Sequence, residues 1–123
     1  MTNSNKNTKL TIKDIGGYIA KEDDRYTVKD NPHLKNLVLS STFLFAGKET
    51  SGHKHEGQEE IYFFIKGKGE MTLDDDRFPV EEGDVILIED GVFHQVSWLK
   101  IYFIIRLRKQ LQKLKLRTVG INM

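Results

Sequence analysis

The amino-acid sequence predicts an all-β fold, either a sandwich or a closed barrel. Short runs of β-branched, aromatic and leucine residues recur at a spacing of about 8–12 residues with glycine-based turns between them, a pattern typical of all-β domains. Residues 60–66 are mostly apolar on both of their alternating faces, which indicates a strand that is covered on both sides.

The expected strands follow one another along the chain as residues 37–46, 60–66, 70–74, 85–88, 92–98 and 100–106. Turns rich in glycine or in acidic residues are expected between them, at residues 47, 67–69, 74–77 and 89–91. Residues 10–30 show only a weak pattern, and residues 1–9 are expected to form a flexible tail. His33 follows Pro32 and is interpreted as a loop histidine without a ligand role. The folded domain is therefore expected to span residues 10–105.

The length of 123 residues suits one domain, and a composition of 38% apolar and 30% charged residues is that of an ordinary globular chain. The chain has no cysteine, so disulfides and thiolate metal sites are excluded. Its polar first ten residues do not form a secretory signal, and no apolar run approaches the ~20 residues of a membrane span. We therefore expect a cytoplasmic protein with no membrane span.

Charge is distributed unevenly along the chain. Residues 1–90 hold 12 basic and 18 acidic residues, a balance of −6, whereas residues 91–123 hold seven basic residues and no acidic one. Leu107, Leu111 and Leu114 recur at helical spacing, so residues 106–117 are expected to pack on the domain as a basic amphipathic helix, with an added strand or an anionic surface as alternatives. The C-terminal extension, residues 106–123, is expected to carry no function. Whether this stretch is the ancestral C-terminus stays open.

Nucleic acid is not expected as a partner, because no aromatic platform accompanies the basic residues after Phe103.

The stretch from Gly47 to Gly67 contains the most distinctive pattern of the chain. His53 and His55 are separated by one residue, so on an extended backbone both imidazoles point to the same side. Two imidazoles and a carboxylate from the next strand form a donor set that suits a divalent transition metal. A lone pair of histidines would equally fit a solvated loop, and the carboxylate could be Glu59 or Glu60.

With these residues placed, the chain resembles the cupin family over about residues 36–105. The first family motif, G-x5-H-x-H-x4-E-x6-G, is matched by Gly47, His53, His55, Glu60 and Gly67. The second motif, G-x5-P-x-G-x2-H-x3-N, is matched by Gly83, Gly91 and His94. Glu89 stands where the motif has proline, and Trp98 stands where it has asparagine. Neither departure removes a metal ligand.

The resemblance implies a double-stranded β-helix of the jelly-roll kind. It also implies one divalent transition metal (iron, manganese, nickel, zinc or cobalt) held by His53, His55, Glu60 and His94. Strand parity with these ligands implies that the substrate cavity is lined by Tyr62, Phe64, Val96 and Trp98. Family membership and the two-sided strand at residues 61–65 together suggest a homodimer.

Two classes of function remain compatible with this pattern. The first is a metal-dependent enzyme that acts on a small molecule, either as an isomerase of a sugar or sugar phosphate or as a dioxygenase. The second is a non-catalytic cupin module that binds or senses a small ligand. The fold alone does not separate the two classes, and no catalytic residue beyond the metal ligands is assigned.

Overall fold

The computed structural model describes residues 8–54, 56–98 and 102–109, and in this part of the chain it contains nine β-strands and no helix. The strands are β1 (Tyr18–Glu22), β2 (Tyr26–Asn31), β3 (Leu37–Leu44), β4 (Glu60–Lys66), β5 (Lys68–Leu73), β6 (Asp76–Glu81), β7 (Val85–Ile88), β8 (His94–Trp98) and β9 (Tyr102–Lys109). Every pair of neighbouring strands is antiparallel. The predicted all-β fold is confirmed. None of the described residues belongs to a helix that could span a membrane.

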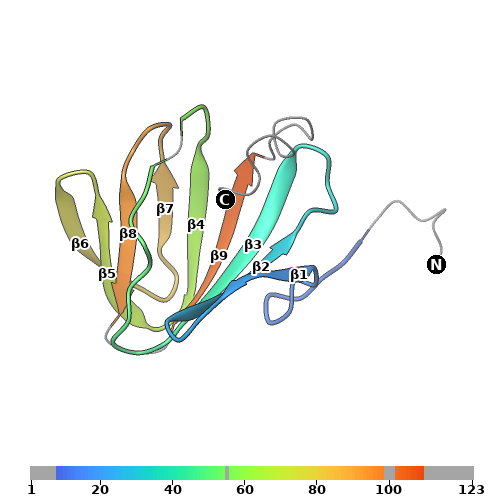
Figure 1. Ribbon diagram of the computed structural model, residues 1–123, viewed down its shortest axis with the longest axis horizontal. Coiled ribbons are helices and arrows are strands. Elements are labelled where there is room, and N and C mark those ends of the chain that lie inside the picture. Colours follow the sequence, from blue (N-terminus) through green and yellow to red (C-terminus); the bar gives the residue numbers. More distant parts are fainter. Residues whose placement is uncertain (1–7, 55, 99–101, 110–123) are drawn as a thin grey trace.

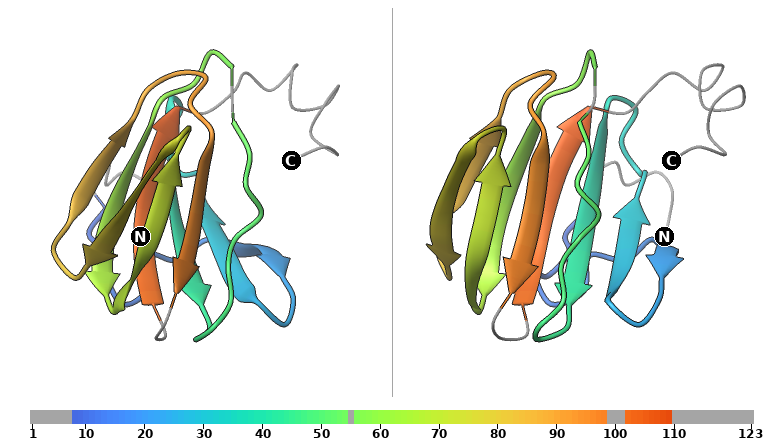
Figure 2. Two further views of the ribbon diagram at one scale, coloured as in Figure 1. Left: turned by 90° about the vertical axis from the view of Figure 1, so that its left-hand side faces the viewer. Right: turned by 60° about the vertical axis from the view of Figure 1, so that its left-hand side comes forward.

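The strands form two sheets that face each other as a jelly roll. Six strands lie in the order β1-β2-β3-β9-β4-β7, and three lie in the order β6-β5-β8 (Figure 1). Residues 47–54, in the connection between β3 and β4, run alongside β8 (Figure 2). The amide of Gly47 donates to the carbonyl of Trp98 at 2.9 Å, and the amide of Thr50 donates to the carbonyl of Val96 at 2.9 Å. The connection therefore extends the smaller sheet and places His53 beside His94.

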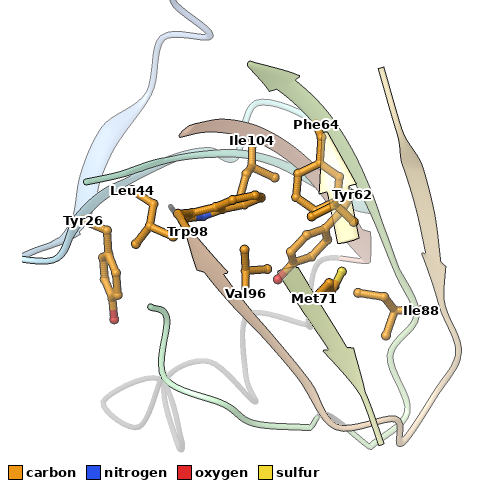
Figure 3. Packing of buried hydrophobic residues seen from close by; sticks show 10 residues of the cluster. Tyr26, Leu44, Tyr62, Phe64, Met71, Ile88, Val96, Trp98 and Ile104 are labelled. Carbon is orange, nitrogen blue, oxygen red and sulfur yellow. The ribbon is translucent and has the colours of Figure 1, made fainter. Parts of the chain in front are cut away.

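The hydrophobic core fills the space between the two sheets (Figure 3). Its buried members are Tyr26, Leu44, Tyr62, Phe64, Met71, Val80, Ile88, Val96, Trp98 and Ile104. Strands β2 to β9 each contribute, and the two members on β4 and the two on β8 are alternate residues, as the two-residue period of a strand requires. The rings of Phe64 and Trp98 pack edge to face with their centroids 5.5 Å apart, a favoured aromatic geometry.

Two glycines have a clear structural role in the connection between β4 and β5. Gly67 has a φ of 104°, a conformation that side chains other than hydrogen rarely allow. At Gly69, a Cβ atom would stand only 1.6 Å from the Trp98 ring. These glycines let the chain turn sharply and let the indole lie against the backbone of β5.

Strand β9 continues to Lys109, beyond the predicted end of the last strand. It pairs with β3 on one side and with β4 on the other, so the helix expected from residue 106 is wrong for residues 106–109, and the strand alternative holds there. The leucine spacing suggested a helix, but pairing on both edges satisfies the strand backbone and decides the structure. Residues 110–117 lie outside the described residues.

The weakly patterned N-terminal region also forms strands. β1 and β2 build the outer edge of the larger sheet, where β2 pairs with β3 along its whole length. All five residues of β1 are exposed to solvent, which explains why its sequence has no alternation of apolar and polar residues that would predict a strand.

Candidate functional site

Charged side chains gather inside the barrel, next to the apolar core. On β4, Glu60 and Tyr62 lie on the same face as the core residue Phe64, and on β9, Arg106 lies on the same face as the core residue Ile104. The strand register pairs Tyr62 with Arg106 and Glu60 with Arg108. The barrel interior is therefore apolar at one end and ionic at the other. We call the charged group the inner ionic cluster; it consists of Asp30, Glu60, His94, Arg106 and Arg108.

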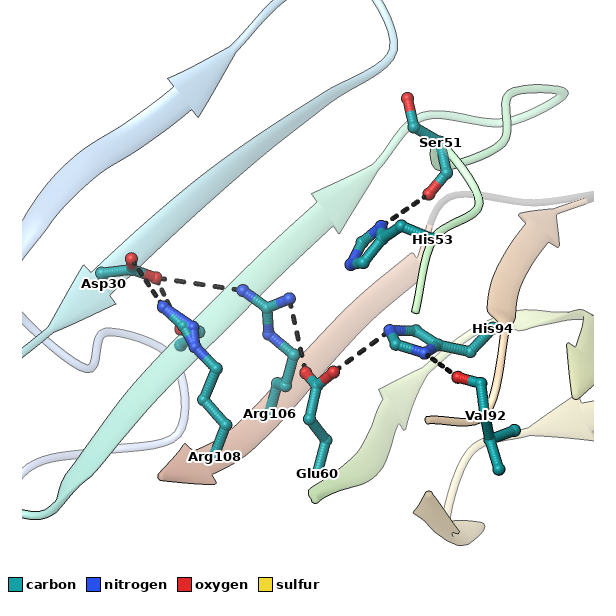
Figure 4. Close-up of polar contacts among 9 residues, drawn as sticks. Asp30, Ser51, His53, Glu60, Val92, His94, Arg106 and Arg108 are labelled. Carbon is teal, nitrogen blue, oxygen red and sulfur yellow. Dashed lines mark hydrogen bonds and ion pairs between the residues drawn. The ribbon is translucent and has the colours of Figure 1, made fainter. Parts of the chain in front are cut away.

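The central contact of the inner ionic cluster joins Glu60 and His94. Glu60 begins β4 and His94 begins β8, and each residue is 2% exposed. The distance between Glu60 Oε2 and His94 Nε2 is 3.1 Å (Figure 4). A carboxylate is rarely buried to this degree unless it is paired. Two residues from different motifs thus meet inside the fold.

His53 lies beside this pair at the solvent-exposed edge of the site. Its amide donates to the His94 carbonyl at 3.2 Å, and the His94 amide donates to the His53 carbonyl at 2.9 Å. The two imidazole rings have centroids 4.7 Å apart and meet edge to face. Partial desolvation lowers the pKa of His53, the neighbouring His94 lowers it further, and contacts with the Ser51 carbonyl and Glu60 oppose this shift.

Backbone carbonyls fix the tautomer of both histidines. Nδ1 of His94 lies 3.2 Å from the Val92 carbonyl, and Nδ1 of His53 lies 3.2 Å from the Ser51 carbonyl. A carbonyl oxygen can only accept a hydrogen bond, so each Nδ1 carries hydrogen and each neutral ring keeps its lone pair on Nε2. Metal-binding histidines commonly have this arrangement, with the second nitrogen donating to a carbonyl.

Two of the expected ligands, Glu60 and His94, meet in a way that could bind a cation. Nε2 of His94 and the Glu60 carboxylate face each other as two electron-pair donors, and a cation between them, either a proton or a metal ion, relieves their repulsion. In the described part of the chain no three His, Asp or Glu side chains are grouped closely enough to enclose an ion. His55, the remaining expected ligand, lies outside the described residues. Glu59 is exposed and Glu60 is buried, so Glu60 is the carboxylate that points inward.

Two arginines of β9 connect Glu60 to Asp30 of β2. Arg108 donates to Asp30 Oδ2 at 3.1 Å. Arg106 lies between the two carboxylates, with Nη1 3.7 Å from Glu60 Oε1 and Nη2 4.0 Å from Asp30 Oδ1 (Figure 4). Ser40 also donates to Asp30, at 2.5 Å. Burial opposes the charged form of Arg106, but Tyr62, Glu60 and Asp30 together raise its pKa, so it stays charged.

Four buried residues were expected to line a substrate cavity: Tyr62, Phe64, Val96 and Trp98. All four point inward and belong to the hydrophobic core. Tyr62 is the one next to the candidate ligands, with its ring centroid 5.8 Å from that of His94. Burial raises the pKa of the Tyr62 phenol to about 12, against the opposing effect of Arg106. The phenol is thus a neutral group beside the ligands, and the cavity role of the four residues stays a prediction.

A groove of about 430 Å³ opens next to the inner ionic cluster. Its lining includes Glu60 and Arg108 of the cluster, together with Gln58, Asp90 and Leu107. Ile61 and Leu107, which alternate with the inward-facing residues of β4 and β9, also line the groove, so it borders the outer side of the larger sheet.

Sequence reasoning missed Asp30, Arg106 and Arg108. The two arginines were assigned to an extension without a function, yet they contact the carboxylates of the site. The available signal was a two-residue alternation from Ile104 through Arg106 to Arg108, which continues the inward face of β9. Asp30 gave no comparable signal, because only the pairing of β2 with β3 brings it inside.

Comparisons with known proteins agree with this architecture. The family model described as "Cupin domain" matches residues 42–100. An uncharacterized protein of Methanocaldococcus jannaschii is 40% identical over 86 residues, which are 68% of this chain and 69% of that protein. The oxalate-binding protein of Thermotoga maritima is 31% identical over 69 residues, which are 56% of this chain and 57% of that protein. Among solved structures, KdgF from Halomonas sp. has a TM-score of 0.69 at 17% identity and covers 81% of this chain and 99% of its own.

The family match covers the segment that contains His53, Glu60 and His94, and the structural likeness extends over most of the barrel. Motif, fold and comparisons therefore lead to one conclusion: this chain belongs to the cupin superfamily.

Proposed function

We propose that the chain is a metal-dependent enzyme: it binds one divalent transition metal and acts on a small molecule. The proposed ligands are His53, His55, Glu60 and His94. The observation that supports this most strongly is the buried contact of Glu60 with His94, with Nε2 of a fixed tautomer turned to the carboxylate. A metal at this position supplies Lewis acidity toward an oxygen donor and, if it is redox-active, supports dioxygen chemistry.

The residues around the proposed ligands would control access and orientation. Tyr62 stays neutral because burial raises the pKa of its phenol to about 12, so it can donate a hydrogen bond to a bound oxygen at neutral pH. Phe64 and Trp98 fill the barrel behind it and exclude water from that side. The reaction class is proposed as isomerisation of a sugar or sugar phosphate, or as dioxygenation.

Metal content tests this proposal directly. Protein purified without chelator should contain about one equivalent of a transition metal by elemental analysis, in line with one site per chain. The His94→Ala variant should contain much less metal than the wild type. His33→Ala is the matched control, because His33 is an exposed loop residue outside the motifs. Equal metal content in the wild type and His94→Ala would remove the basis of the proposal.

A second candidate function is binding without turnover. It is supported by the oxalate-binding protein, whose printed description names binding and which shares 31% identity over 69 residues. The two candidate functions differ in turnover. An enzyme and a binding module would both bind a small ligand when loaded with metal, but only the enzyme would convert that ligand to a product. Screening metal-loaded protein against aldoses, ketoses and small organic acids, with both binding and product detection, separates them.

A homodimer is also proposed, and the outer face of the larger sheet supports it. Ile61 pairs with Leu87, and Phe63 pairs with Val85, across β4 and β7 on the side that faces away from the core. Leu87 is 69% exposed and Val85 is 54% exposed. Adjacent exposed apolar residues of this kind commonly mark an interface.

A further inference from the structure

We propose that Arg106 determines the specificity of the site by selecting an anionic ligand. In this structure its guanidinium pairs with Glu60. When Glu60 becomes a metal ligand, the guanidinium is released toward an anionic oxygen group of the molecule bound at the metal. This inference rests on the proposed metal site and adds the chemical class of the ligand to it.

The first support is the incomplete satisfaction of Arg106. Its side chain is only 14% exposed, and its two ion-pair distances, 3.7 Å to Glu60 and 4.0 Å to Asp30, are too long for hydrogen bonds. Its buried Nε–H has no hydrogen-bond partner among the described residues. A buried guanidinium with donors to spare is costly unless a ligand uses them, and its planar fork matches a carboxylate or a phosphate.

Arg108, in the same cluster, has a hydrogen-bond partner at normal distance. It lies two residues further along β9 on the same face, and its side chain is 16% exposed. It donates to Asp30 at 3.1 Å, a normal charge-assisted hydrogen bond. Arg106 thus differs from its neighbour in partner geometry rather than in burial.

The second support is the charge of the inner ionic cluster. Arg106 and Arg108 carry two positive charges, and Asp30 and Glu60 carry two negative ones, so the cluster is balanced when His94 is neutral. A divalent metal would add two positive charges inside the barrel. Uncompensated buried charge is strongly unfavourable, so a ligand that brings negative charge is favoured over a neutral one. A small carboxylate or inorganic phosphate meets this requirement.

The third support is position. Glu60 lies between His94 and Arg106, with one carboxylate oxygen toward each. Only the Glu60 carboxylate would therefore separate a metal-bound ligand from the Arg106 guanidinium (Figure 4). Asp30 and the neutral phenol of Tyr62 are the other partners of the Arg106 guanidinium.

The test is isothermal titration of protein loaded with one equivalent of Mn²⁺ and freed of excess metal. Oxalate, inorganic phosphate and the neutral malonamide are titrated into the wild type, Arg106→Gln and Arg77→Gln, the last being the control at an exposed arginine of β6. The wild type should bind oxalate or phosphate and should not bind malonamide. Which of the two anions binds more tightly shows whether the natural ligand carries a carboxylate or a phosphate. Arg106→Gln should weaken anion binding at least tenfold, as expected for a lost charge-assisted contact. Arg77→Gln should stay within a few-fold of the wild type.

Metal titration of the same three proteins separates the two levels of the proposal. Arg106→Gln should bind Mn²⁺ as tightly as the wild type or more tightly, because no guanidinium competes for Glu60. If the wild type bound no metal, the proposed function and the role of Arg106 would both be wrong. If the wild type bound metal while Arg106→Gln bound the anions equally well, or if malonamide bound as tightly as oxalate, only the role of Arg106 would be overturned.

Discussion

The carboxylate of Glu60 and the imidazole of His94 face each other inside the barrel, with 3.1 Å between Oε2 and Nε2. The Val92 carbonyl holds Nδ1 of His94 as a hydrogen-bearing nitrogen, so in the neutral imidazole Nε2 turns its lone pair toward the carboxylate. Such a contact requires a cation between the donors or beside them. The positive charge of Arg106, 3.7 Å from the other carboxylate oxygen, meets part of this requirement, and a bound metal would meet the rest.

Metal should stabilise the fold through this contact. A ligand that binds only the folded state adds about 2.7 kcal/mol to the free energy of unfolding at a free concentration of 100 Kd. Thermal unfolding with and without added Co²⁺ should therefore show a higher Tm with metal in the wild type and in His33→Ala. His94→Ala should show no such increase. An equal Tm shift in all three proteins would indicate that the metal binds elsewhere.

Asp30→Asn should be strongly destabilising. The Asp30 side chain is 8% exposed and pairs with Arg108 at 3.1 Å and with Arg106 at 4.0 Å. Removing one partner of a buried ion pair leaves uncompensated charge and typically costs about 3–5 kcal/mol. Urea denaturation measures this loss, and Asp75→Asn, in an exposed hairpin turn, should change the free energy of unfolding little. A loss no larger than that of the control would show that the buried arginines find other partners.

Tyr62 should resist ionisation, because burial raises the pKa of its phenol to about 12. The unfolded state releases this proton near pH 10, so between about pH 10 and 12 the folded state binds more protons than the unfolded one. The contribution of Tyr62 to stability is thus fully present below pH 10 and is lost as the pH rises through this window. Phenolate absorbance during alkaline titration tests this. Tyr62→Phe should abolish the phenolate signal that appears at the highest pH. If the variant instead loses a signal that appears at lower pH, the raised pKa does not belong to Tyr62.

Leu87→Glu should convert a dimer into a monomer. Leu87 is 69% exposed on the outer face of β7, and a charge placed in an apolar interface opposes association. Sedimentation or light scattering at micromolar concentration reports the mass. Lys68→Glu, on the smaller sheet, is the control and should remain dimeric. A monomeric wild type would reject the proposed homodimer.

The sequence predicted the fold and the inward carboxylate because both depend on local spacing. Strand parity placed Glu60, Tyr62 and Phe64 on one face, and the structure has all three buried while Glu59 is exposed. The motif spacing likewise singled out His53 and His94, which the fold brings side by side. The full ligand set stays a prediction, since His55 lies outside the described residues.

The arginines of β9 could not be placed in the same way. Two periods overlap there: leucines at 107, 111 and 114 follow the helical period, whereas Ile104, Arg106 and Arg108 follow the strand period. Only pairing with β3 and β4, which are distant in sequence, selects the strand. The contact of Asp30 with Arg108 depends on the same long-range pairing. Tertiary partners of this kind leave no local pattern.

The most direct test of the central claim is a crystal structure of the metal-loaded protein with anomalous scattering data. We expect one anomalous peak among His53, Glu60 and His94, at roughly 2.0–2.2 Å from imidazole Nε2 atoms and a Glu60 oxygen for a zinc-like ion. We also expect that the Arg106 guanidinium has turned away from Glu60. No peak at this position, or a peak elsewhere with Glu60 still paired to Arg106, would contradict the account.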